Sequence, residues 1–196
     1  MNRAAKTFLR AFGQVLATCL LLGGLMAWAG DSRPFSEYQV KAVFLFNFAR
    51  FVQWPAVAYP ATNSPFVITI VGDDPFGASL DDAVREDRVQ NHAIVIQRIR
   101  HNDPIPPSQI LFIARSEKDR LGEILAQVKN QATLTVADTA RAAEQGTMIN
   151  LVVAQGSVKM EINQQVVESA GLHVSSKLLS LARIVNSSPD QAPSKP

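Results

Sequence analysis

A continuous apolar run from Phe66 to Val71 constrains the fold more than any other feature of this chain. The run is rich in β-branched residues and contains no charge, which is the pattern of a strand covered on both faces. It passes through the loop 72–77 into a helical segment, expected from about Ala78 to Arg85. A buried strand, a short loop and a helix are typical of an α/β protein with a largely parallel sheet.

The rest of the chain continues this alternation. Strands are expected at 93–99, 110–114 and 133–137, followed by a hairpin of 148–153 and 158–162 around Gln155-Gly156-Ser157. Further helices are expected at 36–54, 116–129, 139–144 and 163–170, and a final helix or turn is expected at 175–182. The pattern predicts an α/β fold: one domain, residues 30–185, with a mixed, mostly parallel sheet flanked by helices on both faces. Residues 186–196, rich in Ser and Pro, are expected to form a disordered tail.

The first helix of this domain carries a clear start signal. Ser36 and Gln39 have the spacing of a capping box, and Pro55 should end the helix near Trp54. Its apolar face is broad, because Leu45 and Phe46 extend it beyond one stripe. Such a helix is buried on several sides or meets a partner, and burial in the core is the favoured interpretation. Phe46 is nevertheless a candidate partner contact. Ser116 is expected to cap the later helix 116–129.

The first 29 residues have the layout of a secretory signal peptide. Basic residues open the chain, an uncharged and mostly apolar stretch follows from Ala11 to Trp28, and the stretch closes on Ala27-Trp28-Ala29. Cleavage is therefore predicted between Ala29 and Gly30. The alternative is an uncleaved membrane anchor, since about 18 apolar residues approach the length needed to span a bilayer.

Removal of this leader changes the charge of the chain. The three basic residues of the leader belong to a total of 19 lysines and arginines, so 16 remain against 17 acidic residues. A nearly neutral domain gives no electrostatic reason to expect a nucleic-acid partner. No second apolar segment approaches spanning length, so stable membrane insertion of the mature chain is not expected. The single cysteine, Cys19, leaves with the leader, so the fold must be held without a disulfide.

The sequence contains no recognisable catalytic or metal-binding motif. The three histidines, His92, His101 and His173, are not at metalloprotease or zinc-finger spacing. No Gly-x-Ser-x-Gly elbow is present. We therefore expect no catalytic residue, no metal and no cofactor.

The loop 72–77 is the most suggestive site. It follows a parallel-type strand, where open α/β sheets usually bind ligands, so Asp73, Asp74 and Phe76 are candidate ligand or partner contacts. It is not a phosphate loop, because it lacks the lysine and its two aspartates would repel an anion. The favoured alternative is a tight turn in which one aspartate caps the following helix. Lys177 could contact this acidic loop, although a solvated position is favoured.

Several segments together resemble one family, the YfiR-like (HmsC-like) periplasmic proteins. The resemblance covers nearly the whole mature domain, from about residue 37 to 185, in the correct order and spacing. The segments that carry it are 38–52 with Trp54-Pro55, 72–77, 110–113 with Ser116-Glu117, 161–163, 170–172, 175–179 and 181–185.

This resemblance implies a regulatory role and no catalysis. Studied relatives bind the sensory region of an inner-membrane diguanylate cyclase and hold it inactive, which restrains cyclic-di-GMP signalling and biofilm formation. Relatives often carry cysteines, whereas this mature chain has none, so thiol control does not transfer. The resemblance thus implies a periplasmic repressor with a membrane-bound cyclase as partner, and a homodimer is a further assembly to consider.

A second hypothesis from another class remains open: a small-ligand-binding module with no cyclase partner, whose pocket is lined by loop 72–77. An exposed apolar patch on the first helix or near Leu178 would favour the repressor. An enclosed apolar pocket with a few convergent polar groups would favour the ligand-binding module.

Overall fold

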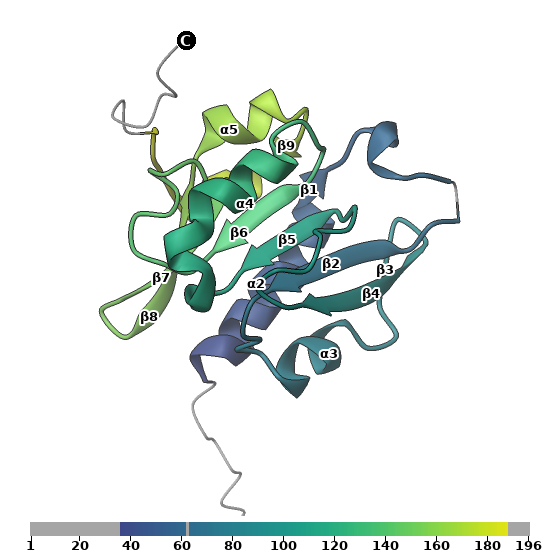
Figure 1. The fold of residues 1–196 in the computed structure, drawn as a ribbon, viewed down its shortest axis with the longest axis horizontal. Coiled ribbons are helices and arrows are strands. Elements are labelled where there is room, and N and C mark those ends of the chain that lie inside the picture. Colours follow the sequence, from purple (N-terminus) through teal and green to yellow (C-terminus); the bar gives the residue numbers. More distant parts are fainter. Residues whose placement is uncertain (1–35, 62, 188–196) are drawn as a thin grey trace, which may run out of the picture. The chain divides into compact units, whose positions relative to one another are not determined.

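A computed structural model describes residues 36–61 and 63–187. The predicted leader, its cleavage site and nearly all of the predicted tail lie outside these described residues. The main sheet has eight strands in the order β10-β8-β7-β6-β5-β2-β4-β3 (Figure 1). Its strands are β2 (Phe66–Val71), β3 (Arg88–Val89), β4 (His92–Ile99), β5 (Ile110–Ile113), β6 (Leu134–Ala137), β7 (Ile149–Ala154), β8 (Ser157–Ile162) and β10 (Ala182–Ile184).

The centre of the sheet is parallel. Strand β2 pairs in parallel with β4 on one side and β5 on the other, and the parallel pairing continues through β6 to β7. The pairs β7–β8 and β3–β4 are antiparallel, and β10 runs parallel to β8. All four residues of β5 and of β6 are buried, as expected for strands covered on both faces. The predicted mixed, mostly parallel sheet is confirmed.

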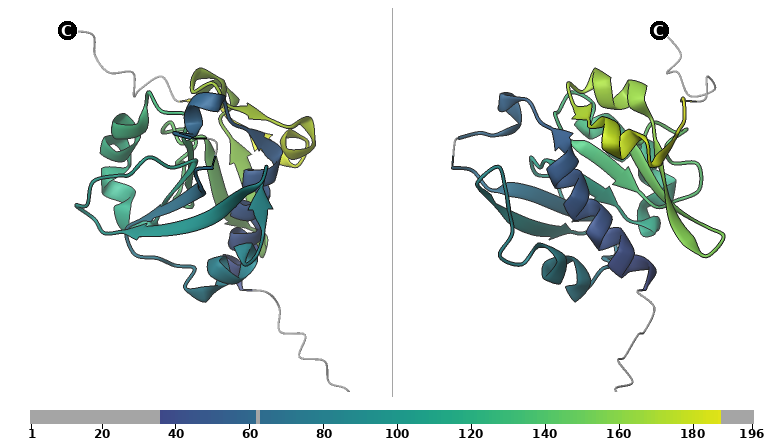
Figure 2. Two further views of the ribbon diagram at one scale, coloured as in Figure 1. Left: turned by 90° about the vertical axis from the view of Figure 1, so that its right-hand side faces the viewer. Right: turned by 180° about the vertical axis from the view of Figure 1, so that it is seen from behind.

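Helices cover both faces of this sheet. Helices α2 (Glu37–Phe51), α3 (Ala78–Val84), α5 (Gln164–Ser169) and α6 (Ser176–Leu179) contribute buried residues to the larger apolar cluster. Helix α4 (Leu121–Val128) packs on the opposite face through Leu121, Ile124 and Val128. Figure 1 shows α4 in front of the sheet and α2 behind it, and the reverse view in Figure 2 shows α2 crossing the back. Among the described helices none is long and apolar enough to cross a membrane.

The first helix begins as predicted and ends earlier. The Ser36 hydroxyl accepts a hydrogen bond from the Gln39 backbone N–H, and the Ser36 backbone N–H donates one to Gln39 Oε1, so the capping box is confirmed. The prediction that the helix reaches Trp54 was wrong. Val52 and Gln53 form β1 (Val52–Gln53), which pairs with β9 (His173–Val174) in a separate two-stranded antiparallel sheet. This pairing draws the chain out of helical geometry before the position set by Pro55.

The hairpin prediction is also confirmed, with the turn at Gln155 and Gly156. Both residues have positive φ, 52° and 72°, as a tight hairpin turn between twisted strands requires. The helix expected at 139–144 was wrong, because that segment forms consecutive turns and Arg141 adopts a left-handed φ of 60°. The final segment forms the short helix α6, capped by Ser175, and then the unpredicted edge strand β10.

The helix expected at 116–129 is divided. A 3-10 helix, Arg115–Arg120, precedes α4, and its N-cap residue is Ala114. Ser116 is therefore not the cap that the sequence indicated. Its hydroxyl instead accepts a hydrogen bond from the backbone N–H of Asp73, at 2.9 Å.

Candidate functional site

The strand order defines where a ligand crevice is expected. Strands β4-β2-β5-β6-β7 follow the second-first-third-fourth-fifth order of one common doubly wound sheet. The chain leaves β2 toward α3 on one face and leaves β5 toward α4 on the other. The carboxyl ends of β2 and β5 therefore flank the topological switch point, where such sheets usually bind ligands.

Side chains close this switch point. Gly72 has a φ of 93°, and a Cβ atom at this position would lie 2.4 Å from Ser116 Oγ and 2.8 Å from Glu117. The loop after β2 is thus packed directly on the start of the 3-10 helix after β5. Only glycine allows this approach, so the position is a structural constraint on the edge of the sheet.

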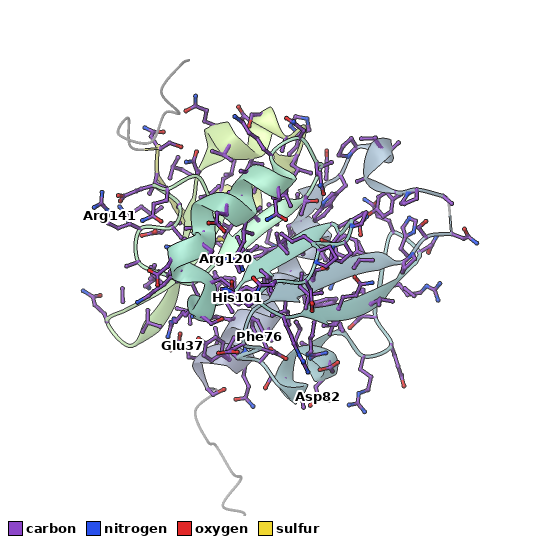
Figure 3. The ribbon with its side chains drawn as sticks, in the orientation of Figure 1. Glu37, Phe76, Asp82, His101, Arg120 and Arg141 are labelled. Carbon is purple, nitrogen blue, oxygen red and sulfur yellow. The ribbon has the colours of Figure 1, made fainter. Side chains whose placement is uncertain are left out.

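Glu117 is buried in the closed crevice, and two basic side chains contact its carboxylate. His101 Nδ1 lies 2.9 Å from one carboxylate oxygen, and Arg120 Nη1 lies 3.0 Å from the same oxygen. Figure 3 shows His101 and Arg120 close together, toward the same end of the molecule as Glu37 and Phe76. This cluster joins the loop after β4 to the loop after β5, and it fixes the shape of the carboxyl edge.

A second cluster lies at the next position along the same edge and is more deeply buried. Lys41 of α2 and Asp138, directly after β6, have side chains with 0% exposure, and Lys41 Nζ lies 2.7 Å from Asp138 Oδ2. Two charges removed from water cost several kcal/mol each unless they are paired. The pair links the first helix to the centre of the sheet across 97 residues of sequence.

Three further side chains complete this cluster. Glu37 accepts hydrogen bonds from Lys41 at 2.5 Å and from Arg115 at 2.6 Å, and Arg115 Nε lies 3.2 Å from Asp138 Oδ2. The Tyr38 hydroxyl donates to Asp138 Oδ2 at 2.9 Å. Burial, together with the neighbouring Asp138 carboxylate, raises the pKa of Tyr38 above its ordinary value. We call these five residues (Glu37, Tyr38, Lys41, Arg115 and Asp138) the Lys41–Asp138 cluster.

Stability should depend on the charge of Glu37 at acid pH. The hydrogen bond from Lys41 lowers the pKa of Glu37 below its ordinary value of 4.5, against an opposing effect of partial burial, and the charges of Lys41 and Arg115 lower it further. Because the folded pKa is the lower one, this contribution is present above the unfolded pKa and is lost as pH falls through the folded pKa. Chemical unfolding should therefore show that the stability of Glu37→Gln falls less than that of the unaltered protein when the pH is lowered below about 4.5. Glu86→Gln, at an exposed glutamate, is the control, and equal acid profiles for the two variants would contradict the account.

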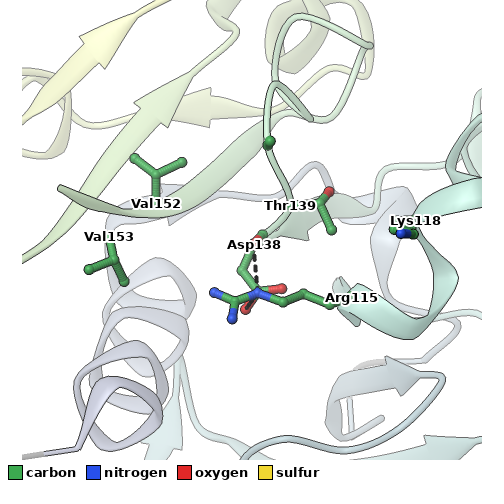
Figure 4. A pocket seen from close by; sticks show the side chains of 7 residues that line it. Arg115, Lys118, Asp138, Thr139, Val152 and Val153 are labelled. Atoms are coloured by element: carbon green, nitrogen blue, oxygen red, sulfur yellow. Dashed lines mark hydrogen bonds and ion pairs between the residues drawn. The ribbon is translucent and has the colours of Figure 1, made fainter.

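A cavity of about 440 Å³ lies beside the cluster and is broadly open to solvent. Its wall includes Arg115 and Asp138, and Figure 4 shows Val152 and Val153 on one side of them and Thr139 and Lys118 on the other. The cavity therefore combines basic and hydroxyl groups with an apolar wall, outside the carboxyl ends of β5 and β6.

The aspartates of loop 72–77 differ in their surroundings. Asp74 accepts a hydrogen bond from the Phe76 backbone at 2.8 Å and forms an ion pair with Arg98 at 2.6 Å. Asp73 is exposed, and its side chain makes no hydrogen bond with a described residue. Neither aspartate caps α3, whose N-cap residue is Gly77, so the capping interpretation was wrong and the turn interpretation holds for Asp74. Phe76 is buried against the rings of Tyr38 and Phe112.

This difference gives a direct prediction. Asp74→Ala should lower the free energy of unfolding by about 1 kcal/mol, because a turn hydrogen bond and an ion pair are lost. Asp73→Ala should change it by less than about 0.5 kcal/mol. Urea unfolding of both variants measures the two effects. Unchanged stability of Asp74→Ala would contradict the structural role of this turn.

The remaining two candidates lie elsewhere. Lys177 does not contact the acidic loop. Its Nζ lies 5.4 Å from the ring centroid of Phe51, at the carboxyl end of α2. The acidic loop lies near the opposite end of this helix, where Phe76 contacts Tyr38. Phe46 is half-buried, packs against the core and is covered by Arg50 at 5.6 Å. Leu45, which widened the apolar face in the sequence, is fully buried. Most of the apolar excess of this helix therefore belongs to the core.

The Lys41–Asp138 cluster was missed by sequence reasoning, although a signal was present. Arg115 and Asp138 follow two buried strands, β5 and β6, within two residues of each strand end. The carboxyl ends of neighbouring parallel strands meet at one edge, so the two residues could have been placed together. Lys41 gave no such signal, since a lysine on a helix is usually solvated. Within residues 36–61 and 63–187, no group of three His, Cys, Asp or Glu residues is arranged to hold a metal ion.

The fold and the edge define the class: an α/β domain with a mixed sheet, a closed switch point and a buried charge cluster at its carboxyl edge. A family model described as YfiR/HmsC-like matches residues 38–183. The chain therefore belongs to the YfiR/HmsC-like family, which is a family of periplasmic regulatory proteins. No curated protein matches the chain.

Proposed function

We propose that this chain is a periplasmic regulatory protein that binds the sensory region of an inner-membrane diguanylate cyclase and represses it. Repression would lower cyclic-di-GMP and biofilm formation. Membership of the YfiR/HmsC-like family supports a regulatory role. Export through a leader cleaved between Ala29 and Gly30 is part of the proposal, and an intact mass beginning at Gly30 would test it.

One observation on the surface carries the proposed interaction. Leu178 is buried, but Leu181, three residues later, has 71% exposure, and Ile184 has 47%. Both lie at β10, an end strand of the main sheet, whose outer edge pairs with no other described strand. Exposed apolar side chains on an open sheet edge are typical of a protein interaction site. We call Leu181 and Ile184 the β10 patch and propose that the cyclase contacts it.

Deletion of the gene tests the proposal in the cell. Loss of the repressor should raise cyclic-di-GMP and surface attachment, and a plasmid copy with its leader should restore both. A copy without residues 1–29 cannot be exported if the leader is read correctly, so it should fail to restore them. Unchanged cyclic-di-GMP in the deletion strain, with candidate cyclases expressed, would contradict repression.

A second candidate function is a small-ligand-binding module without a cyclase partner. The cavity beside the Lys41–Asp138 cluster favours it, because the cavity is of ligand size and combines few polar groups with an apolar wall. The predicted pocket on loop 72–77 is not the one found, since Ser116 and Glu117 fill that crevice. The two functions are compatible if a ligand controls the partner.

A further inference from the structure

A second groove lies between α4 and α5, separate from the cavity beside Asp138 (Figure 1). Its volume is about 430 Å³, and it shares no lining residue with that cavity. Four residues on one side have the spacing i, i+3, i+4 and i+7, which places them on one face of α4 and its C-cap: Gly122, Leu125, Ala126 and Lys129. Seven residues of α-helix extend about 10 Å, so this side of the groove is long enough for an extended chain.

The groove is open because several of its walls carry small side chains. Gly122 and Ala126 on α4 and Ala170 at the end of α5 leave the space between the two helices unfilled. Larger apolar side chains complete the lining, among them Leu125, Val128, Met148 and Val166. Ligand sites in proteins are typically of this kind, mostly apolar with a small number of placed polar groups.

One polar group of the lining is buried and only partly used by the fold. Thr135 of β6 has 2% exposure and lines the groove. Its Oγ1 accepts a hydrogen bond from the backbone N–H of Met148 at 3.0 Å, and its own hydroxyl proton is donated to no described residue. A threonine hydroxyl can donate as well as accept, so a ligand that brings an acceptor would use this proton.

The charges of the groove favour an uncharged ligand. Among the described residues that line it none is acidic, and one, Lys129, is basic. Lys129 is the C-cap residue of α4, where its positive charge complements the partial negative charge of the helix end. The Ser169 hydroxyl already donates to the Val166 carbonyl oxygen at 2.8 Å. The groove therefore offers an unused neutral donor, Thr135, and no excess charge for an ionic ligand to balance.

We propose that this groove binds an uncharged molecule that has an unbranched apolar chain and a carbonyl oxygen. The chain lies along the small and apolar side chains of α4, and the carbonyl oxygen accepts the free hydroxyl proton of Thr135. The proposal concerns a small molecule and does not depend on the repression of a cyclase.

The first test titrates the mature chain, residues 30–196, with the ketone 2-octanone and follows the NMR signals of the groove residues. These signals should shift in a saturable manner. 2-Butanone should bind at least about tenfold more weakly, because four methylene groups fewer are buried. Octanoate has a chain of the same length with a charged head, and it should bind at least about fivefold more weakly, since burial of a carboxylate near the negative end of α4 is unfavourable.

A pair of variants places the ligand in the groove. Ala126→Leu fills the groove from α4 and should abolish binding of 2-octanone. Leucine is a good helix former and Ala126 is exposed, so the unfolding midpoint should not fall. Gln127→Leu is the matched control: it adds the same side chain at the next position of α4, which does not line the groove, and it should bind like the unaltered protein.

A second pair tests the hydrogen bond to the ligand. Thr135→Val removes the hydroxyl and should weaken binding of 2-octanone about fivefold, as the loss of one neutral hydrogen bond implies. Thr135→Ser keeps a hydroxyl at this position and should bind within about twofold of the unaltered protein.

Three results would overturn the proposal. The first is the absence of saturable shifts with 2-octanone up to about 5 mM. The second is equal binding by Ala126→Leu and Gln127→Leu, which would place the ligand outside the groove. The third is tighter binding of octanoate than of 2-octanone, which would show that the groove recognises a charge.

Discussion

Replacing Asp138 by alanine is expected to lower the free energy of unfolding by about 3–5 kcal/mol. The substitution leaves the ammonium group of Lys41 buried, with only the partly exposed Glu37 as a counter-charge. It also removes the acceptor of the Tyr38 hydroxyl and one partner of Arg115. Because small domains are stable by only about 5–15 kcal/mol, this loss is a large part of the total. Urea unfolding at neutral pH measures it.

A double variant distinguishes two causes of the stability loss in Asp138→Ala: the unpaired buried charge of Lys41 and the volume of the side chain removed. Lys41→Met combined with Asp138→Leu removes both charges and keeps apolar volume, so it should recover much of the stability lost in Asp138→Ala. Asp82→Ala breaks an exposed ion pair with Arg85 and should cost less than about 1 kcal/mol. Similar losses for Asp138→Ala and Asp82→Ala would show that the Lys41–Asp138 cluster is not the buried charge cluster described.

Charged residues in the β10 patch are expected to abolish repression without unfolding the domain. Leu181→Asp together with Ile184→Asp would place two carboxylates in the proposed apolar interface, and a central contact of this kind is typically worth 2 kcal/mol or more, roughly a thirtyfold loss of affinity. Cyclic-di-GMP should rise to the level of the deletion strain. Both side chains are largely outside the core, so the unfolding midpoint should change little.

The matched control for the β10 patch is Val57→Asp. Val57 is also exposed, but it lies in the 3-10 helix Ala56–Ala58, which is distant from β10 in the sequence and is not part of the main sheet. This variant should repress like the unaltered protein. Full repression by the double β10 variant would exclude the patch as the contact surface.

Local signals in the sequence were sufficient for much of the fold. The capping box at Ser36 and Gln39, the apolar run Phe66–Val71 and the Gln155-Gly156 turn each act within a few residues, and each is present in the structure. Each of these elements is determined by backbone geometry or by burial on two faces, and a short sequence pattern is enough to indicate it. The fold class followed from their order.

The errors have long-range causes. The first helix stops early because Val52 pairs with Val174, more than a hundred residues away, and β10 exists because its residues align with Met160 to Ile162. Neither pairing leaves a local pattern. The burial of Lys41 has the same origin, since its partner Asp138 follows β6, 97 residues later in the sequence. The candidate site residues came from loop 72–77, from Phe46 and from Lys177, and none of them belongs to the cluster that α2 forms with the residues after β5 and β6.

The central claim, direct repression of a diguanylate cyclase, is tested most directly by reconstitution. Each full-length cyclase of the host that has a periplasmic region would be placed in nanodiscs, which leave both of its faces accessible, and its rate of cyclic-di-GMP synthesis measured with and without the mature protein. The account predicts that one cyclase slows in a saturable manner with the unaltered protein and with Val57→Asp, and does not slow with the double β10 variant. Unchanged synthesis by every such cyclase at saturating mature protein would contradict it.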